Sequence, residues 1–328
     1  MAKILITYPL DTPKLDELRS LHYLEILPAG TEVTEDLLCR EARDCEALAV
    51  LLLHRISARV MESAPRLKIV ANVAVGFDNV DVPSARRLGI FVTNTPEVLT
   101  RATADLTWAL ILACARRIVE ADRFLREGRF RGWAPDLFVG MDLAGKTLGI
   151  IGMGRIGREV ASRAGAFGMK VVYSDLSDQS DRSDKSDQSD TSDPRPRAMP
   201  LDALLAESDV VSLHVPLTGA TRGLLSRDRL IRMKPGAILI NTSRGPVVDE
   251  SALADALKSG RLSAAGLDVY EHEPAVHPDL LRLPRTVLLP HIGSAGGDTR
   301  RAMADLALEN IRRVLAGINP LTNVYAVE

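Results

Sequence analysis

The stretch "TLGIIGMGRIGREVASRAGAFGMKVVYSD" (147–175) is the segment that decides the fold. An apolar run passes directly into a GxGxxG pattern, and a helical pattern follows it. In such a loop the first glycine permits a tight turn, and the second lets a pyrophosphate approach the backbone. The third allows the helix to pack on the strand, and the amino end of the helix favours the anion. We therefore predict a nucleotide-binding loop at Gly152, Gly154, Arg155, Ile156 and Gly157.

Asp175 ends the next apolar run, 23 residues after Gly152. A carboxylate at this place can accept hydrogen bonds from the adenosine ribose hydroxyls, and it repels a 2′-phosphate. The sequence therefore favours NAD(H) as cofactor, with NADP(H) possible. The alternative interpretation is that Asp175 is merely the first acidic residue of a repeat.

That repeat is "SDLSDQSDRSDKSDQSDTSDP" (174–194), seven consecutive Ser-Asp-x triplets. Such a segment has too little apolar surface to offset its ordering entropy, and surface loops tolerate long insertions. We predict a Ser-Asp-rich insertion at 177–194 that expanded without a function. Its net negative charge would further disfavour NADP(H) at the neighbouring adenosine site.

Outward from this segment, apolar runs alternate with helical patterns along the whole chain. Such an alternation indicates parallel sheets covered by helices on both faces. The runs form two series, separated by a long helix expected from about Ala102, with Thr100 as its cap, to Gly128. The runs lie at 3–9, 47–53, 67–73, 89–94, 146–152, 169–175, 209–216, 236–243, 264–270 and 286–291.

The predicted fold class is α/β, with two Rossmann-like (flavodoxin-like) domains and an active site in the cleft between them. A late helical pattern at 300–317 could cross back to pack on the first domain. We therefore predict a discontinuous substrate-binding domain, 1–99 plus 291–328. An NAD-binding domain at 100–290 would contain the insertion.

Composition narrows the functional class. The chain has 328 residues, of which 46% are hydrophobic, and a formal charge of −2. This balance gives no electrostatic sign of a nucleic acid or an anionic membrane as partner. The cysteines show no metal-site spacing, so no metal is expected, and three thiols suit a reducing cytosol. The apolar run at 106–115 is too short to span a bilayer, and the start of the chain does not resemble a signal peptide. We expect a soluble cytoplasmic protein.

Three polar residues follow the ends of apolar strands, where ligands gather in parallel sheets: Arg244, Glu273 and His291. A guanidinium can hold a substrate carboxylate, and a histidine can deliver a proton to a carbonyl oxygen as hydride reaches the carbon. A glutamate can orient that imidazole. Taken singly, each also has a structural interpretation: a surface charge, a turn acid and an edge histidine.

The chain resembles the D-isomer-specific 2-hydroxyacid dehydrogenase family, and most closely its glyoxylate/hydroxypyruvate reductase branch. The resemblance covers nearly all of the chain except the Ser-Asp repeat. It rests on "VANVAVGFDNVDVPSARRLGIFVTNTPEVLTRATADLTWALIL" (70–112), "GMDLAGKTLGIIGMGRIG" (140–157), "HVPLT" (214–218), "LINTSRGPVVDESAL" (239–253), "AGLDVYEHEP" (265–274) and "LPHIGSA" (289–295).

The resemblance implies roles for individual residues. His291 would be the acid/base, acting with Arg244 and Glu273. The amides of Val75 and Gly76 would receive the substrate carboxylate, and Leu52 and Leu53 would line the substrate side. Further cofactor contacts are implied for Thr103, His214, Pro216, Thr242, Ser243, Asp268, Gly293 and Ser294.

The resemblance also implies a homodimer joined through the cofactor domains. A loop around Trp133 would reach the neighbouring active site, although a core role for Trp133 is an equal alternative. Leu51 stands where 3-phosphoglycerate dehydrogenases carry an arginine, which argues against a phosphorylated substrate.

The expected activity is therefore NADH-dependent reduction of small 2-keto acids, glyoxylate or hydroxypyruvate, to 2-hydroxy acids. D-lactate or 3-phosphoglycerate dehydrogenase activity is the alternative within the family. An NADH-sensing, corepressor-like binding protein is the alternative of another class, because fold alone does not determine function.

Overall fold

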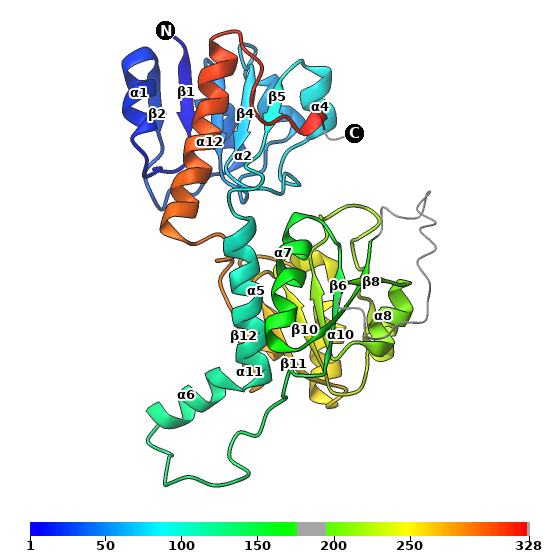
Figure 1. The fold of residues 1–328 in the computed structure, drawn as a ribbon. Helices are drawn as coiled ribbons and strands as arrows, with labels where there is room; N and C mark the ends of the chain where they lie inside the picture. Colours follow the sequence, from blue (N-terminus) through cyan, green and yellow to red (C-terminus); the bar gives the residue numbers. More distant parts are fainter. Residues whose placement is uncertain (176–194, 327–328) are drawn as a thin grey trace. The chain divides into compact units, whose positions relative to one another are not determined.

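A computed structural model describes residues 1–175 and 195–326; the predicted insertion at 177–194 lies outside the described residues. The chain forms two compact units (Figure 1). Unit 1 comprises Met1–Leu99 and Ser294–Glu328, and unit 2 comprises Thr100–Gly293. The second boundary lies three residues after the one expected at residue 290, so His291 belongs to unit 2 and not to unit 1.

Unit 1 contains a five-stranded parallel sheet with the strand order β2-β1-β3-β4-β5. Its inner strands consist of short apolar runs that are buried along their whole length, as a sheet covered on both faces requires. The strands are β1 (Lys3–Ile6), β2 (Tyr23–Ile26), β3 (Ala47–Val50), β4 (Ile69–Asn72) and β5 (Phe91–Thr93).

Helices surround the unit 1 sheet: α1 (Lys14–Leu21), α2 (Glu35–Glu41), α3 (Ala58–Glu62), α4 (Val82–Arg87) and α12 (Gly297–Leu315), with a 3₁₀ turn at Val324–Ala326. The late helix α12 packs against α1, β3 and β4 and so completes unit 1 (Figure 1). Met303, Ala307 and Ile311 are among its buried residues, at the spacing of one helix face.

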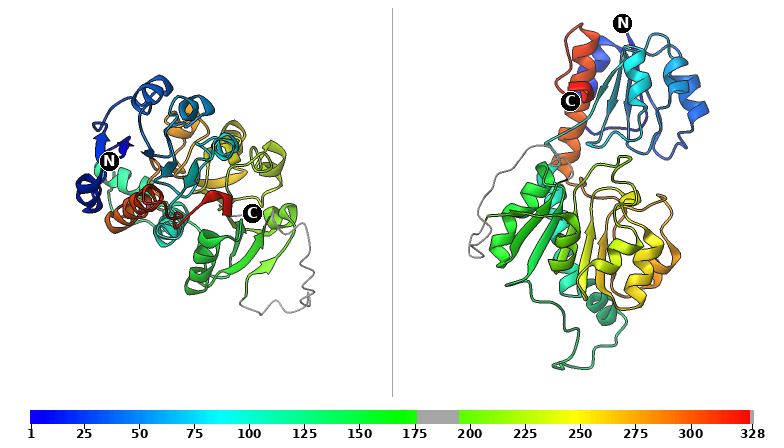
Figure 2. Two further views of the ribbon diagram at one scale, coloured as in Figure 1. Left: turned by 90° about the horizontal axis from the view of Figure 1, so that it is seen from above. Right: turned by 90° about the vertical axis from the view of Figure 1, so that its right-hand side faces the viewer.

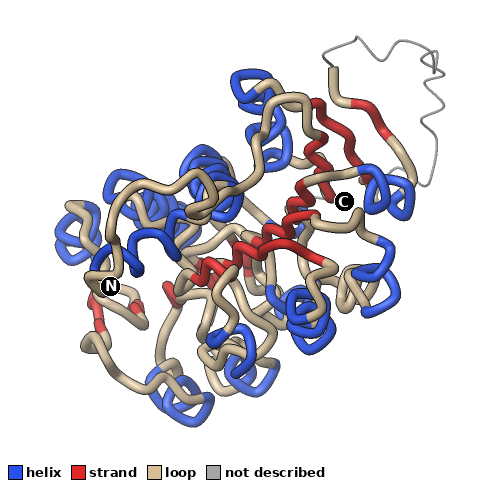
Figure 3. The backbone as a smooth tube through the Cα atoms, turned by 90° about the horizontal axis from the view of Figure 1, so that it is seen from below, coloured by secondary structure: helices blue, strands red, loops and turns tan. Residues whose placement is uncertain are grey.

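Unit 2 contains a seven-stranded parallel sheet with the order β12-β11-β10-β9-β6-β7-β8. The strands are β6 (Thr147–Ile151), β7 (Lys170–Ser174), β8 (Arg197–Ala198), β9 (Val210–Leu213), β10 (Ala237–Asn241), β11 (Leu262–Leu267) and β12 (Thr286–Leu288). Numbered within the unit, this order is 3-2-1-4-5-6-7, the doubly wound order of dinucleotide-binding sheets with one strand added. The strands twist progressively across the sheet (Figure 3).

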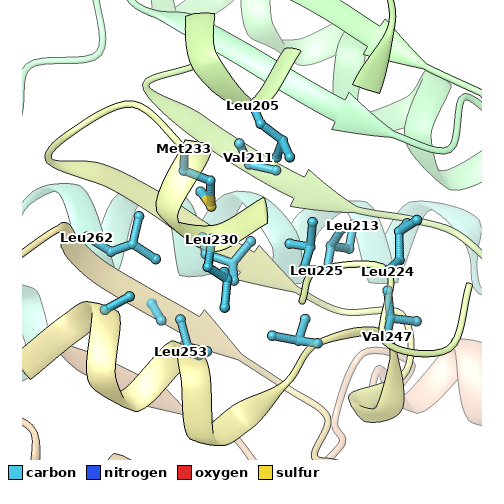
Figure 4. Packing of buried hydrophobic residues seen from close by; sticks show 14 of the residues in the cluster. Leu205, Val211, Leu213, Leu224, Leu225, Leu230, Met233, Val247, Leu253 and Leu262 are labelled. Atoms are coloured by element: carbon cyan, nitrogen blue, oxygen red, sulfur yellow. The ribbon is translucent and has the colours of Figure 1, made fainter. Parts of the chain in front are cut away.

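Helices cover both faces of this sheet (Figure 2). Neighbouring residues of one strand serve opposite faces: Val210 packs with one buried cluster and Val211 with the other. Figure 4 shows the cluster around Val211, Leu230 and Met233. The helices are α5 (Thr100–Ala115), α6 (Ile118–Arg126), α7 (Arg155–Ala164), α8 (Leu201–Glu207), α9 (Arg227–Arg232), α10 (Glu250–Lys258) and α11 (Pro278–Arg282), with 3₁₀ turns at Gly165–Phe167 and Gly245–Val247.

The long helix expected up to Gly128 is interrupted, which corrects the sequence prediction. The helix α5 begins at Thr100 and ends at Ala115, and Arg117 then adopts a left-handed backbone with φ 53°. Its guanidinium pairs with Glu120 at 2.9 Å and lies over the ring of Phe138. The helix α6 restarts at Ile118 and extends away from the sheet of unit 2 (Figure 1).

Among the helices of the described chain, none combines the length and the hydropathy that a bilayer crossing requires.

Candidate functional site

The glycine loop joins β6 to α7 at the carboxyl edge of the unit 2 sheet. Gly152 has φ 95°, and a Cβ there would lie 2.7 Å from the carbonyl oxygen of His214. A Cβ at Gly157 would lie 2.1 Å from the carbonyl oxygen of Gly152, so α7 can approach β6 only because residue 157 is glycine. Beside Gly154, by contrast, a Cβ would meet nothing within 4 Å. This open space before the first turn of α7 fits a pyrophosphate held against backbone amides.

Asp175 directly follows β7, the strand next to β6. The amide of Gly152 donates to the carbonyl of Ser174 at 2.9 Å, so the glycine loop and the end of β7 are tied together. The carboxylate at 175 therefore lies just after the strand that adjoins the glycine loop, as the spacing between them predicts. This placement suits recognition of a ribose attached to a pyrophosphate on the loop.

His291 and Glu273 form a hydrogen-bonded pair in unit 2. The Nδ1 atom of His291 lies 2.9 Å from Oε2 of Glu273, and both side chains are partly exposed. A carboxylate can only accept, so Nδ1 carries the proton of this bond and Nε2 is the nitrogen left for other chemistry. The pKa of Glu273 is lowered: burial opposes the charge, but the hydrogen bond from His291 and the positive charges of His291 and Arg244 outweigh it.

The backbone of His291 is held in an uncommon conformation. Its φ of 55° lies in the left-handed region, which a residue other than glycine adopts at a cost. The carboxylate of Asp268, which is 1% exposed, accepts from the amides of Ile292 and Gly293, both at 2.7 Å. Burial raises the pKa of Asp268, and the two amides oppose that shift. Asp268 thus holds the segment that carries His291.

Glu273 lies on a loop that is also fixed at several points. The amide of Tyr270 donates to Oε1 of Glu273 at 3.0 Å, and the Tyr270 hydroxyl donates to the carbonyl of Leu289 at 2.9 Å. Buried Glu250, at the start of α10, accepts from the amide of Glu271 at 2.6 Å. Burial raises the pKa of this Glu250 carboxyl.

Arg244 follows β10 and comes against the same loop. A Cβ on the next residue, Gly245, would lie 1.8 Å from the carbonyl carbon of Tyr270. Only a glycine permits this approach, and it brings the Arg244 backbone to the loop of Glu273. The Nδ2 atom of Asn241 donates to the carbonyl of Arg244 at 3.0 Å, and Nη1 of Arg244 donates to the carbonyl of Ser243 at 2.9 Å.

The other predicted cofactor residues of unit 2 lie after strand ends or on the helices α5 and α7. Thr103 on α5 donates to the carbonyl of Gly293 at 3.1 Å. Thr242 shares a hydrogen bond of 3.0 Å with Thr107 of α5. Ser243 is bonded through its amide and hydroxyl to Oδ1 of Asn241, Pro216 is exposed, and Ile156 is half-buried in the first turn of α7.

His214 follows β9, and its Nε2 lies 2.9 Å from the Ser212 hydroxyl. Burial lowers the pKa of this imidazole to about 3, so the ring is neutral at neutral pH. It can therefore shape the site without adding a charge beside the anion-binding loop.

Of the predicted substrate residues, Arg244 and His291 belong to unit 2 and the others to unit 1. Leu52 is half-buried and Leu53 is exposed, in the loop after β3. Val75 and Gly76 follow β4, and their carbonyls accept from asparagine side chains. Ser294 is the first residue of the returning segment of unit 1.

Sequence reasoning missed Gly245 and Glu250, which position the residues that it found. Gly245 directly follows the candidate arginine at a strand end, and this adjacency is a signal that could have been used. For Glu250 no comparable signal exists, because an acidic residue in a first helical turn is ordinarily exposed. In residues 1–175 and 195–326, no group of three His, Cys, Asp or Glu side chains could hold a metal ion.

Known proteins are similar to this chain in sequence and in structure. Residues 108–293 match the model of the D-isomer specific 2-hydroxyacid dehydrogenase, NAD binding domain. A glyoxylate reductase of Thermococcus onnurineus is 44% identical over 326 residues, covering 98% of this chain and 95% of that protein. A crystal structure from Thermus thermophilus has 46% identity and a TM-score of 0.89, covering 98% of this chain and 99% of that one.

A further solved structure is an NADPH-dependent glyoxylate/hydroxypyruvate reductase from Sinorhizobium meliloti in complex with NADP and malonate. Its identity is 34% and its TM-score is 0.85, with 98% of this chain and 96% of that chain covered.

Proposed function

We propose, because this chain belongs to the D-isomer-specific 2-hydroxyacid dehydrogenases, that it reduces glyoxylate and hydroxypyruvate to 2-hydroxy acids. As a member of this family the chain is an oxidoreductase that uses a nicotinamide cofactor. The observation that carries the proposal is the 2.9 Å pair of His291 and Glu273, with Gly245, the residue after Arg244, packed against the same loop.

The chemistry follows from this pair. The bound cofactor supplies the hydride for the carbonyl carbon. His291 donates a proton from Nε2 to the carbonyl oxygen, since Nδ1 is engaged with Glu273. The Glu273 carboxylate fixes the orientation of the imidazole ring through this hydrogen bond. Arg244 holds the substrate by its carboxylate or by the polarised carbonyl oxygen.

Unit 1 supplies the remaining substrate contacts in this proposal. The amides of Val75 and Gly76 receive the substrate carboxylate, and Leu52 and Leu53 line the substrate side. The apolar character of this leucine pair suits a small, unphosphorylated keto acid. Support comes from the family membership of the chain and from the carbonyls of residues 75 and 76, which are held by asparagine amides.

We also propose NADH as the preferred cofactor. Asp175 directly follows the strand beside the glycine loop, where a carboxylate accepts from ribose hydroxyls and repels a 2′-phosphate. The Sinorhizobium meliloti relative is NADPH-dependent, so the preference rests on Asp175 of this chain and not on family membership.

A homodimer joined through unit 2 is the assembly that we propose. The helix α6 has no buried residue, and neither has the loop after it, residues 127–142. Apolar side chains in this arm are exposed, which a lone subunit rarely tolerates over a contiguous patch. They are Ile118, Val119, Leu125, Phe130, Trp133 and Val139, with Trp133 at 84% exposure. Leu125→Asp should shift the sedimentation coefficient toward that of a monomer, whereas unchanged sedimentation would contradict this assembly.

Cytoplasmic location is supported by the thiols: Cys39, Cys45 and Cys114 are all free, as a reducing compartment allows. Cell fractionation with an antibody to the protein tests this location.

The experiment that tests the activity compares His291→Asn with His272→Asn, an exposed histidine near Glu273. The initial rate of NADH oxidation is measured with glyoxylate, hydroxypyruvate, pyruvate and phosphohydroxypyruvate. We expect turnover with the first two compounds and a loss of kcat of about 10²- to 10⁴-fold in His291→Asn. The His272 variant and NADH binding by both variants should match the wild type.

Normal turnover by His291→Asn would refute the assignment of the proton donor. A wild-type preference for pyruvate or phosphohydroxypyruvate would instead indicate the D-lactate or 3-phosphoglycerate branch. NADH binding with negligible turnover of all four compounds would favour the binding-protein alternative.

A further inference from the structure

The segment after β4 is held from one side by asparagines. The Nδ2 atom of Asn94 donates to the carbonyl of Val75, and Nδ2 of Asn72 donates to the carbonyl of Gly76, both at 2.8 Å. Asn72 is the last residue of β4 and is fully buried, whereas Asn94 follows β5 and is half-buried. Two neighbouring carbonyls thus point toward the ends of the strands from which these side chains come.

A third carbonyl in the same run behaves alike, because Ala74 accepts from the amide of Thr95 at 2.8 Å. All three peptide groups are trans, and in a trans peptide the carbonyl and the amide point in opposite directions. The amides of Val75, Gly76 and Phe77 are therefore turned away from the groups that hold the carbonyls. Three consecutive amides with this constraint suit an anion.

A third asparagine, Asn79, fixes the orientation of the Asn72 side-chain amide. The Nδ2 atom of Asn79 donates to the carbonyls of His54 at 3.0 Å and Leu51 at 3.3 Å, and to Oδ1 of Asn72 at 3.2 Å. Main-chain carbonyls only accept, so the nitrogen of Asn79 must face them. Oδ1 of Asn72 is then the atom that faces Asn79, which leaves its Nδ2 for Gly76.

The side-chain oxygen of Asn79 shows that this orientation is imposed. Oδ1 of Asn79 is buried and has no hydrogen-bond partner among the described residues. An unmet buried acceptor is destabilising, and an amide that could turn freely would turn to satisfy it. The three acceptors around Nδ2 outweigh that cost.

We infer that Asn72 and Asn79 are positioning residues for the substrate carboxylate, and that the amide of Phe77 joins those of Val75 and Gly76 in binding it. The inference rests on the proposed function and extends it. Asn79 ties the loop after β3 to Asn72, and Asn72 turns the peptide group that carries the Phe77 amide. Neither asparagine touches the substrate.

The test uses the whole protein and two substitutions that act on the peptide group between Gly76 and Phe77. Asn72→Asp places a carboxylate oxygen against the Gly76 carbonyl, and the repulsion should turn that peptide group. Phe77→Pro removes the amide hydrogen, and Phe77→Ala is its matched control because it keeps the amide. Asn323→Asp is the control for an added charge in unit 1, at a half-buried asparagine that accepts from the Tyr325 amide.

The quantities measured are KM and kcat for glyoxylate, the inhibition constant of oxamate and the dissociation constant of NADH. We expect Asn72→Asp and Phe77→Pro each to raise KM and the oxamate constant by roughly tenfold to a hundredfold, the range of one hydrogen bond to a charged group. The NADH constant should not change. The double variant should lose less than the product of the two effects, because both act through the same amide.

Unchanged oxamate inhibition in Asn72→Asp and Phe77→Pro would overturn the inference. Equal losses in Phe77→Ala and Phe77→Pro would overturn the role of the Phe77 amide, and independent effects in the double variant would overturn the link from Asn72 to it. Calorimetry of oxamate binding to the NADH-loaded protein measures the contribution of the three amides to binding without turnover. A wild type that reduces no keto acid but binds oxamate, with the losses above, would refute the proposed reaction and leave this site standing.

Discussion

The two units of this protein share a type of architecture but differ in the turn that follows the first strand of each. Both have parallel sheets covered by helices, with strand orders β2-β1-β3-β4-β5 and β12-β11-β10-β9-β6-β7-β8. In unit 2 the turn after β6 contains Gly152 and Gly154, and Gly157 follows in the first turn of α7. Gly152 permits a close approach to His214, and Gly157 permits the close approach of α7 to Gly152. In unit 1 the turn after β1, "TYPLDTP" (7–13), contains no glycine.

The turn in unit 1 is instead occupied by side chains. Thr7 is buried, donates to the carbonyl of Ala49, and lies 2.7 Å from Nδ1 of buried His54. Burial lowers the pKa of this histidine, which therefore adds no charge there at neutral pH. The same sheet type thus carries a nucleotide loop in one unit and a packed polar contact in the other. The ligand is determined by the turn and not by the sheet.

The largest effect on stability and NADH affinity is expected from a substitution of Gly157. In Gly157→Ala the new Cβ would lie 2.1 Å from the carbonyl oxygen of Gly152, which is backbone and cannot rotate away. We expect α7 to be displaced, with a loss of stability of about 1–3 kcal/mol and NADH affinity lowered by more than about a hundredfold. Thermal unfolding and NADH fluorescence titration measure the two quantities.

Gly154→Ala is the matched variant, because its Cβ would meet nothing within 4 Å and its φ of −73° suits alanine. Its stability should stay within about 0.5 kcal/mol of the wild type. NADH affinity should nevertheless fall about tenfold, since the methyl group occupies the space for the pyrophosphate. If the two variants lose stability equally, the steric distinction between the glycines is wrong.

Much of the fold could be predicted because buried parallel strands consist of continuous apolar runs. Each of the ten predicted runs contains or overlaps a strand. The strands β2 and β8 were missed, since both are short edge strands without a buried residue: β2 is mostly half-buried, and β8 consists of two exposed residues. The break at Arg117 was missed because no glycine or proline marks it; the ion pair with Glu120 and the ring of Phe138 hold it instead.

The candidate site, like the fold, could be predicted only in part from the sequence. The types of side chain at the strand ends predicted His291 and Glu273, and the structure brings them together at 2.9 Å. What could not be predicted is how their loops are held. That depends on contacts between residues distant in sequence, such as Glu250 with the amide of Glu271, and on close approach at Gly245.

A smaller effect, on cofactor preference alone, is expected at Asp175 in unit 2. Asp175→Ala removes the carboxylate that we assign to the ribose hydroxyls. The ratio of kcat/KM with NADPH to that with NADH should rise by roughly tenfold, about the worth of one hydrogen bond to a charged group. Asp202→Ala, at an exposed carboxylate paired with Arg232, is the control. An unchanged ratio would mean that Asp175 is only the first acid of the repeat.

The smallest effect is expected in unit 1, at the contact between α1 and α12. Glu309 bonds to Arg312 at 2.7 Å and to Lys14 at 3.1 Å. The hydrogen bond from Arg312, aided by Lys14, lowers the pKa of Glu309 from 4.5 to about 2 against the opposing effect of burial. A lowered carboxyl pKa stabilises the folded state above the unfolded pKa, and this contribution disappears as pH falls through the folded value.

Glu309→Gln should therefore cost about 1 kcal/mol at neutral pH, and its difference from the wild type should vanish between pH 4.5 and about 2. Thermal unfolding across this range measures the difference, and NADH affinity, a property of unit 2, should not change. A difference that persists unchanged at the acid end would show that the contact stabilises unit 1 by packing and not by charge.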